Sequence, residues 1–346
     1  MRILIVKLSA FGDIIHALPA LDDLRRRPEQ PEIHWLVDAR YAFVTEVLPP
    51  DVQVHVAPLK AGDWRGVLRA IRELRALRFD AVLDLQGLIK SAVLARLAGA
   101  TVFGLDARQM REQPARWLER CTPFHPDERH IVQQLRRVAT APFAFDSVAP
   151  AEKAGAPDAP IPYRPPRIPL TDAMQTAADE TLRGWALEGP YVWLHLGGGW
   201  ATKQLPEDTW RAVAEGATER GLTPVLGWGN ARERERARQL GQLVPAAFVP
   251  PRRLPMPSLC GVLARAQAVI GADTGVVHLA AALGTPTISF WGPSASWRSG
   301  PQGPADRHVE SNPPCGPCFR RTCDQFVCMD MIRAGDILAA LDEIRS

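Results

Sequence analysis

Short apolar segments alternate with helix-forming segments along most of the chain, and this alternation constrains the fold more than any other feature. In a first round, apolar runs at residues 3–7, 33–37 and 81–85 are each followed by apolar residues at helical spacing. A second round begins with YVWLHL at residue 191 and continues to about residue 290. Buried strands separated by helices are typical of βαβ units. The pattern therefore predicts two α/β domains, each with a parallel sheet.

A proline-rich stretch separates the two rounds. Residues 148–170 read VAPAEKAGAPDAPIPYRPPRIPL. Because proline fixes φ and lacks an N–H donor, this stretch is unsuited to the interior of a sheet. We interpret it as an interdomain linker or a surface segment and expect domains at residues 1–165 and 166–346, with a last helix able to pack back on the first domain. Ligands of open α/β sheets bind beyond the carboxyl ends of the strands, so we expect a cleft there.

The composition fits a soluble globular protein and excludes some classes. Of the 346 residues, 46% are hydrophobic and 23% are charged, and the formal net charge is +3. That charge is too small to indicate nucleic-acid binding, but it suits anionic small molecules or an anionic membrane surface. A spanning helix is not expected, because runs of about 18 apolar residues are lacking. Lys7 and Asp13 interrupt the first apolar run, so we interpret it as a strand rather than a signal peptide and expect a cytoplasmic protein with reduced cysteines.

The strongest local signal is the segment GADTGVVHLAAALGTPTISFWGPS at residues 271–294. A buried strand here leads directly into Asp273, Thr274 and Gly275, and His278 follows one helical turn later. The start of a helix offers free N–H groups and a positive dipole end, which favour a phosphate. Gly275 would allow that phosphate to approach the backbone closely. The alternative is that Asp273 and Thr274 only cap the helix.

A second glycine-bearing loop, LHLGGGWATKQLP, follows the strand at residue 191. Gly198 and Gly199 permit close backbone approach to a phosphate, and Lys203 supplies a cation nearby. Three consecutive glycines are also typical of an ordinary flexible loop. The loop lacks the G-K-[S/T] element of a P-loop, and the chain lacks a G-x-G-x-x-G followed by an acidic residue, which argues against a nicotinamide enzyme.

The first strand ends in a loop that contains Ser9, Gly12 and Asp13. A carboxylate in a strand-to-helix turn is exposed at the edge of the sheet, where it can act as a general base. The alternative is that Asp13 simply caps the following helix.

Four cysteines lie close together near the end of the sequence, at a spacing of C-x2-C-x4-C-x4-C. They are Cys315, Cys318, Cys323 and Cys328. In a reduced protein this pattern indicates a tetrahedral thiolate site, although the later spacings are shorter than those of common zinc modules. Four unligated thiols are the alternative.

Four stretches together resemble the ADP-heptose:lipopolysaccharide heptosyltransferase family, most of all its type I members. They are MRILIVKLSAFGDIIHALPAL, FDAVLDLQGLIKSAVLARLAG, WLHLGGGWATKQLPEDTW and GADTGVVHLAAALGTPTISFWGPS. The resemblance implies a GT-B fold, in which two Rossmann-like domains face each other across a cleft. It also implies inverting transfer of L-glycero-D-manno-heptose from ADP-heptose to a Kdo-lipid A acceptor, in the biosynthesis of the lipopolysaccharide inner core. The first domain would bind the acceptor and the second would bind the donor.

The same resemblance assigns roles to individual residues. Asp13 matches the catalytic base, and Lys203 matches the lysine that contacts the donor phosphates. Donor-binding positions fall on Gly198, Gly199, Glu233, Asp273, Thr274, Gly275 and His278. For the acceptor, whose Kdo carboxylates and lipid A phosphates are anionic, we expect contacts from Ser9, Gly12, Lys90, Arg108 and Arg111; plain solvated surface charges are the alternative for the last three.

The resemblance implies that catalysis needs no cofactor and that the protein contacts the cytoplasmic face of the inner membrane peripherally. A structural zinc or iron ion at the four cysteines is a separate expectation. Alternative functions are a type II or III heptosyltransferase, a protein heptosyltransferase, a sugar-nucleotide epimerase, and a nucleotide-sugar-binding protein without activity.

Overall fold

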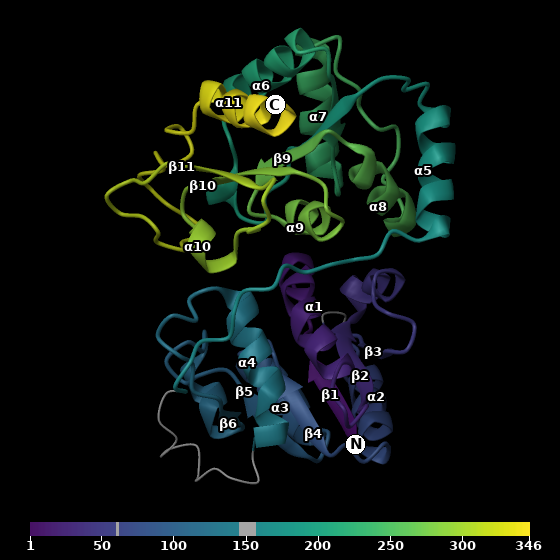
Figure 1. The fold of residues 1–346 in the computed structure, drawn as a ribbon, viewed down its shortest axis with the longest axis vertical. Helices are drawn as coiled ribbons and strands as arrows, with labels where there is room; N and C mark the ends of the chain where they lie inside the picture. The colour runs from purple at the N-terminus through teal and green to yellow at the C-terminus, as the bar shows by residue number, and fades with distance from the viewer. Residues whose placement is uncertain (60–61, 145–156) are drawn as a thin grey trace. The chain divides into compact units, whose positions relative to one another are not determined.

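The computed structural model describes residues 1–59, 62–144 and 157–346, which form two compact units (Figure 1). The units are Met1–Pro166 and Arg167–Ser346. Each contains a parallel sheet with helices between the strands, so the predicted α/β class with two parallel sheets is confirmed. The first part of the proline-rich stretch, residues 148–156, lies outside the described residues.

The N-terminal unit is built on a six-stranded parallel sheet with the strand order β3-β2-β1-β4-β5-β6. Its elements are β1 (Arg2–Val6), α1 (Phe11–Arg25), β2 (Glu32–Asp38), η1 (Ala39–Glu46), β3 (Gln53–Ala57), α2 (Trp64–Ala76), β4 (Ala81–Asp84), α3 (Ile89–Leu97), β5 (Thr101–Gly104), η2 (Gln113–Trp117), β6 (Arg120–Cys121) and α4 (Ile131–Ala144). The central strand β1 is apolar after Arg2, and β4 is apolar up to Asp84, because both faces of the sheet are covered. The order reverses between β1 and β4, which places a topological switch point between their carboxyl ends.

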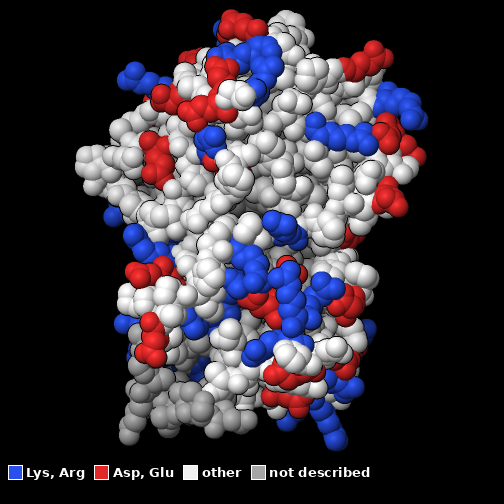
Figure 2. All heavy atoms as spheres, in the orientation of Figure 1, with Lys and Arg blue, Asp and Glu red and all other residues white. Residues whose placement is uncertain are grey.

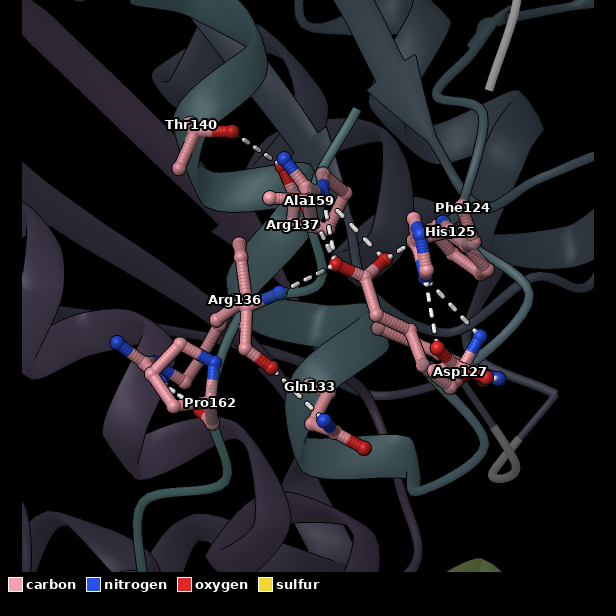
Figure 3. Close-up of polar contacts among 12 residues, drawn as sticks. Phe124, His125, Asp127, Gln133, Arg136, Arg137, Thr140, Ala159 and Pro162 are labelled. Carbon is pink, nitrogen blue, oxygen red and sulfur yellow. Dashed lines mark hydrogen bonds and ion pairs between the residues drawn. The ribbon is translucent and has the colours of Figure 1, made fainter. Parts of the chain in front are cut away.

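Residues 159–161 of the proline-rich stretch are bound to the N-terminal unit, mainly through α4 (Figure 3). Arg137 donates a hydrogen bond to the carbonyl of Ala159 at 2.7 Å, and Gln133 donates to the carbonyl of Ile161 at 2.7 Å. The backbone N–H of Ile161 in turn donates to the carboxylate of Glu128 at 2.8 Å. These bonds satisfy backbone groups that a proline-rich segment cannot place in a sheet. Residues 159–161 therefore follow the surface of this unit in a fixed path.

The C-terminal unit is built on a five-stranded parallel sheet with the order β11-β10-β9-β7-β8. Its elements are α5 (Asp172–Gly184), β7 (Tyr191–His195), η4 (Ala201–Lys203), α6 (Glu207–Glu219), β8 (Thr223–Gly227), α7 (Ala231–Leu243), α8 (Met256–Arg265), β9 (Ala268–Ala272), α9 (Gly275–Ala282), β10 (Thr287–Trp291), α10 (Ser296–Ser299), β11 (Arg307–Glu310) and α11 (Ala334–Arg345). The switch point lies between β7 and β9. The last helix, α11, packs against α6, β10 and β11 within this unit.

Charges of both signs are interspersed over the face drawn in Figure 2, where Lys and Arg side chains lie among Asp and Glu side chains. This mixture matches the small formal net charge of +3. Among the described residues, the helices are all too short or too polar to cross a bilayer.

Candidate functional site

Asp13 lies in the first turn of α1, just beyond the carboxyl end of the central strand β1. Its Oδ2 accepts a hydrogen bond from the backbone N–H of Ala10 at 3.1 Å. Asp13 therefore does cap the helix, but with only one of its two oxygens. Oδ1 has no hydrogen-bond partner among the described residues, and the side chain is partly exposed. The carboxylate is thus held by its own loop through one oxygen and can accept a proton on the other.

The loop after β4 holds the Asp13 loop in place. The Oε1 atom of Gln86 accepts hydrogen bonds from the backbone N–H groups of Leu8 and Ser9, at 3.0 and 3.1 Å. Gln86 itself is fixed by Asp84, whose Oδ1 accepts from the Gln86 N–H at 2.8 Å. The sequence analysis missed Gln86, although it lies within one of the stretches that carry the family resemblance. Its two contacts depend on β1 and β4 being neighbours, which local sequence cannot show.

A buried lysine lies at the same switch point. The Nζ of Lys7 donates to the carbonyl of Leu85 at 2.5 Å, and the residue is 3% exposed. Burial lowers the pKa of Lys7, although the carboxylates of Asp13 and Asp84 oppose this effect. Burial also raises the pKa of Asp84 to about 6, against the hydrogen bonds from Gln86 and Ser91 and the charge of Lys7. The carboxyl end of β1 therefore has a buried cation next to the candidate base.

The other predicted acceptor residues all follow strands of this sheet at its carboxyl edge. Lys90 is in the first turn of α3, after β4, and is exposed; Arg108 and Arg111 lie in the loop after β5. Arg108 is not an independent cation, because its guanidinium is bound to both oxygens of Asp106, at 3.1 and 3.0 Å. Arg40, after β2, is bound to Asp38 in the same way, at 3.0 and 2.9 Å. The sequence analysis missed Arg40, but the repeated tripeptide Asp-Ala-Arg could have revealed it.

A second buried carboxyl group lies near β5. The oxygens of Glu119 have no hydrogen-bond partner among the described residues. They pack so closely on Gly104 that a Cβ atom there would lie 2.2 Å away. Burial, together with the charge of Asp84, raises the pKa of Glu119 to about 9. At neutral pH the folded protein therefore holds a proton on this side chain that the unfolded chain releases.

Replacement of Glu119 by Gln is expected to stabilise the N-terminal unit above pH 5. Because the folded-state pKa is raised, the wild type loses stability as pH rises from about 4.5 towards 9, and the amide does not. At pH 8 the free energy of unfolding of the variant should exceed that of the wild type by more than about 1.4 kcal/mol, the equivalent of one pK unit. Urea unfolding at several pH values measures this, with exposed Glu188→Gln as control. Parallel pH profiles for Glu119→Gln and the wild type would contradict it.

The centre of the C-terminal unit's site is a buried ion pair between its two switch-point loops. The Nζ of Lys203, at the end of η4, lies 2.6 Å from Oδ2 of Asp273, which follows β9. The other oxygen, Oδ1, lies 2.9 Å from Nε2 of His278 on α9. Burial alone would raise the pKa of Asp273, but the hydrogen bond from His278 and the charge of Lys203 outweigh it and hold the pKa well below its usual value. The structure thus brings three predicted donor residues together.

Thr274 and Gly275 form the start of α9, directly beside this ion pair. Thr274 is the N-cap residue, but its side chain makes no capping hydrogen bond. Its Oγ1 is buried and has no partner among the described residues. Because Asp273 is engaged with Lys203 and His278 instead, the interpretation of Asp273 and Thr274 as mere caps is wrong. A free hydroxyl and the first N–H groups of a helix are therefore available to an anion.

The glycine-rich loop lies between this ion pair and the start of α7. A Cβ atom on Gly198 would come within 3.3 Å of the Lys203 side chain, whereas Gly199 has open space. Glu233, in the first turn of α7, accepts a hydrogen bond from the N–H of Gly229 at 2.7 Å. Its other oxygen would be 2.6 Å from a Cβ atom on Gly197. The predicted donor residue Glu233 thus lies beside the loop that contains the other two, Gly198 and Gly199.

His195 is a further residue of this site that the sequence analysis missed. It ends β7, is buried, and lies beside Gly197. Burial lowers its pKa even though the carboxylate of Glu233 opposes the shift. Its Nδ1 has no hydrogen-bond partner among the described residues. A neutral imidazole at the carboxyl end of β7 offers a further hydrogen-bonding group to a ligand of the glycine-rich loop.

The four cysteines line one small cavity, together with Thr202 and Gly292. All four are free thiols, from exposed Cys315 to buried Cys328. In the described part of the chain, however, no three cysteine, histidine or carboxylate groups are arranged to hold a metal ion. The cysteines share a location without forming a ligand cage.

The two switch points differ in the chemistry that they support. The N-terminal one presents a carboxylate next to a buried cation, which suits proton abstraction. The C-terminal one presents a lysine, a free hydroxyl and a helix start, which suit binding a phosphate group and stabilising negative charge on it.

Comparisons with known proteins show the family of the chain. The model of "Glycosyltransferase family 9 (heptosyltransferase)" matches residues 67–326. Lipopolysaccharide heptosyltransferase 1 of Pseudomonas aeruginosa is 37% identical over 337 residues, which cover 93% of this chain and 87% of the relative. The protein of the same description from Escherichia coli K12 is 32% identical over 309 residues, covering 85% of this chain and 88% of the relative.

A solved structure extends the likeness to the fold. The E. coli heptosyltransferase WaaC with ADP superposes with a TM-score of 0.72 at 25% identity, covering 99% of this chain and all of that chain. The predicted GT-B class, with its two Rossmann-like domains, is therefore confirmed.

Proposed function

The chain belongs to glycosyltransferase family 9, the heptosyltransferases, and from this premise we propose that it transfers L-glycero-D-manno-heptose from ADP-heptose to a Kdo-lipid A acceptor. It is a glycosyltransferase by family membership; its donor and acceptor are the proposal. The observation that carries the donor assignment is the ion pair of Lys203 and Asp273 beside the unpaired hydroxyl of Thr274. These groups lie where a parallel sheet of this order binds its ligand.

The proposed chemistry divides between the two units. Asp13 takes the proton of the acceptor hydroxyl while that oxygen forms a bond to C1 of the heptose. The bond from C1 to the diphosphate oxygen breaks on the opposite face, so the configuration inverts and the electron pair leaves with ADP. Lys203 and the N–H groups at the start of α9 stabilise the charge on the departing diphosphate. ADP leaves as an anion, so one protein base suffices.

Donor and acceptor classes can be tested together. Purified protein is incubated with ADP-heptose, ADP-mannose and UDP-sugars, each with Kdo-lipid A, a heptosylated core acceptor, or no acceptor, and products are read by mass spectrometry. We expect one heptosyl residue to be added to Kdo-lipid A from ADP-heptose alone. Transfer only to the heptosylated core would indicate a type II or III enzyme. Conversion of the donor without acceptor would indicate an epimerase, and binding without any conversion a non-catalytic protein.

We propose that the enzyme works at the cytoplasmic face of the inner membrane, held there peripherally. The anionic headgroups that surround a lipid A acceptor would be met by the exposed cations Lys90 and Arg111 at the carboxyl edge of the N-terminal sheet. The acceptor sugars would then lie near Ser9 and Gly12, which flank the candidate base.

A structural zinc or iron ion at the cysteines is a separate part of the proposal. Support comes from their spacing and from the cavity that they share. Protein purified without chelators should contain about one equivalent of zinc or iron by elemental mass spectrometry, and the double variant Cys318→Ser/Cys323→Ser should contain none. A Cys121→Ser variant is the control, because Cys121 belongs to the other unit. Metal-free wild-type protein would contradict the proposal.

A further inference from the structure

The cysteine loop, residues 315–328, lies directly against the turn that carries Lys203. Thr202, the residue before this lysine, is 3% exposed, and its Oγ1 donates a hydrogen bond of 2.7 Å to the carbonyl of Arg320. This bond joins residues that are 118 positions apart in the sequence. The contact therefore links two separate segments of the C-terminal unit.

A second contact involves Trp200, three residues before the lysine. The guanidinium of Arg321 lies over the ring of Trp200, 5.4 Å from its centroid. The ammonium of Lys203 lies over the same ring at 4.2 Å. Residues 320 and 321 thus contact two residues that precede the donor-site lysine: Thr202 within η4 and Trp200, the N-cap residue of η4.

The cysteine loop is itself fixed to the sheet. The N–H of Phe319 donates to the carbonyl of Pro293 at 2.8 Å. Gly292, which follows β10, approaches Cys328 so closely that a Cβ atom would lie 3.0 Å from its Sγ. The loop therefore contacts the residues that follow β10 as well as the η4 turn.

We propose that the cysteine loop is a positioning element of the donor site, which holds the η4 turn so that Lys203 points at Asp273 and at the donor diphosphate. This rests on the proposed function, since it assigns the loop to the donor site described above. A loose turn would spread the lysine over several rotamers, and binding would have to restrict them again. Because Cys318 and Cys323 flank residues 319–321, any change that reshapes the loop at its cysteines also reaches Lys203. The cysteine motif, which the transfer chemistry does not use, then acts through the position of Lys203.

The test uses an isosteric pair of substitutions and a matched control. Thr202→Val removes the hydroxyl while keeping the shape, and Thr202→Ser keeps the hydroxyl. Thr285→Val is the control, because Thr285 is also buried and also donates its hydroxyl to a backbone carbonyl, that of Leu263 at 3.1 Å, but before β10 rather than beyond a strand end. Calorimetry measures ADP affinity in the full-length protein, and thermal unfolding measures stability.

We expect Thr202→Val to bind ADP about five- to tenfold more weakly, as the loss of one buried hydrogen bond allows. Thr202→Ser should restore the affinity, and Thr285→Val should lose stability without losing affinity. The KM for the nucleotide sugar should rise in Thr202→Val more than kcat falls, which a loss of stability alone would not produce. Unchanged ADP affinity in Thr202→Val would overturn the proposal, and so would an equal loss in Thr285→Val.

The Lys203→Ala variant distinguishes a failure of this inference from a failure of the proposed function. If Lys203→Ala leaves ADP binding unchanged, the donor assignment itself is wrong. If Lys203→Ala loses ADP binding but Thr202→Val does not, the donor site stands and only the role of the cysteine loop is wrong.

Discussion

The Asp13→Asn variant should transfer heptose about 10²- to 10⁴-fold more slowly than the wild type, the usual contribution of a general base. The substitution preserves the loop, because an asparagine oxygen can still accept the hydrogen bond from the N–H of Ala10. What it removes is the ability to take the proton of the acceptor hydroxyl. ADP affinity should be unchanged, because this residue belongs to the N-terminal unit and the proposed donor residues do not.

The rate is measured as initial velocity of acceptor glycosylation by mass spectrometry, with ADP affinity by calorimetry on the same samples. Asp127→Asn is a suitable control, because the Asp127 carboxylate is in the same unit and 78% exposed. Near-normal transfer by Asp13→Asn would remove this residue from the mechanism.

The Lys203→Ala variant should show the second large effect, on both binding and stability. A charge-assisted hydrogen bond to a phosphate is worth about 1.5–3 kcal/mol, so ADP affinity should fall about 10- to 100-fold, and transfer with it. The same substitution leaves the buried Asp273 carboxylate with His278 as its remaining side-chain partner. Breaking a buried pair in this way costs about 3 kcal/mol of unfolding free energy.

Lys90→Ala provides the matched control for the lysine substitution, because Lys90 belongs to the other unit and is exposed. Its ADP affinity should equal that of the wild type. The double variant Lys203→Met/Asp273→Leu should recover stability, since no unpaired charge remains, but it should not recover ADP binding. If ADP binds Lys203→Ala as tightly as the wild type, the diphosphate lies elsewhere.

Most strands that contain a run of apolar residues could be predicted from sequence, whereas β6 and β11 could not. Apart from Arg2 at the start of β1 and His195 at the end of β7, these two strands consist of buried apolar and aromatic residues, and they were predicted close to the observed places. Strand β11 reads RHVE and pairs only with β10, so it lacks that signal. Strand β6 contains only two residues, and α4 contains Pro142, so neither gives a clear pattern.

A similar limit applies to the site. Loops after strands could be recognised one at a time, because glycine, lysine and acidic residues at a strand end have known uses. Their pairing depends on the strand order. Lys203 follows β7 and Asp273 follows β9, and the two residues meet because these strands are neighbours in the sheet. Gln86 meets Ser9 for the same reason, through the neighbouring strands β1 and β4. Such contacts follow from topology and not from local composition.

After the apolar run at residues 33–37, the spacing of apolar residues predicts a helix at residues 41–47, and here the structure differs. The structure has instead a 3-10 helix, η1, over Ala39–Glu46, with a non-helical backbone at Tyr41. The Asp38 side chain accepts a hydrogen bond from the N–H of Arg40 and binds its guanidinium, which fixes a tight turn where a regular helix would begin. Sequence periodicity alone does not show this local competition.

A crystal structure of the protein with ADP and a Kdo-containing acceptor tests the roles of Lys203 and Asp13 most directly. We expect the diphosphate to contact Lys203 and the N–H groups at the start of α9, and the accepting hydroxyl to lie within hydrogen-bond distance of the Asp13 carboxylate. A complex in which the diphosphate avoids Lys203, or in which Asp13 faces bulk solvent away from the acceptor, would contradict this expectation.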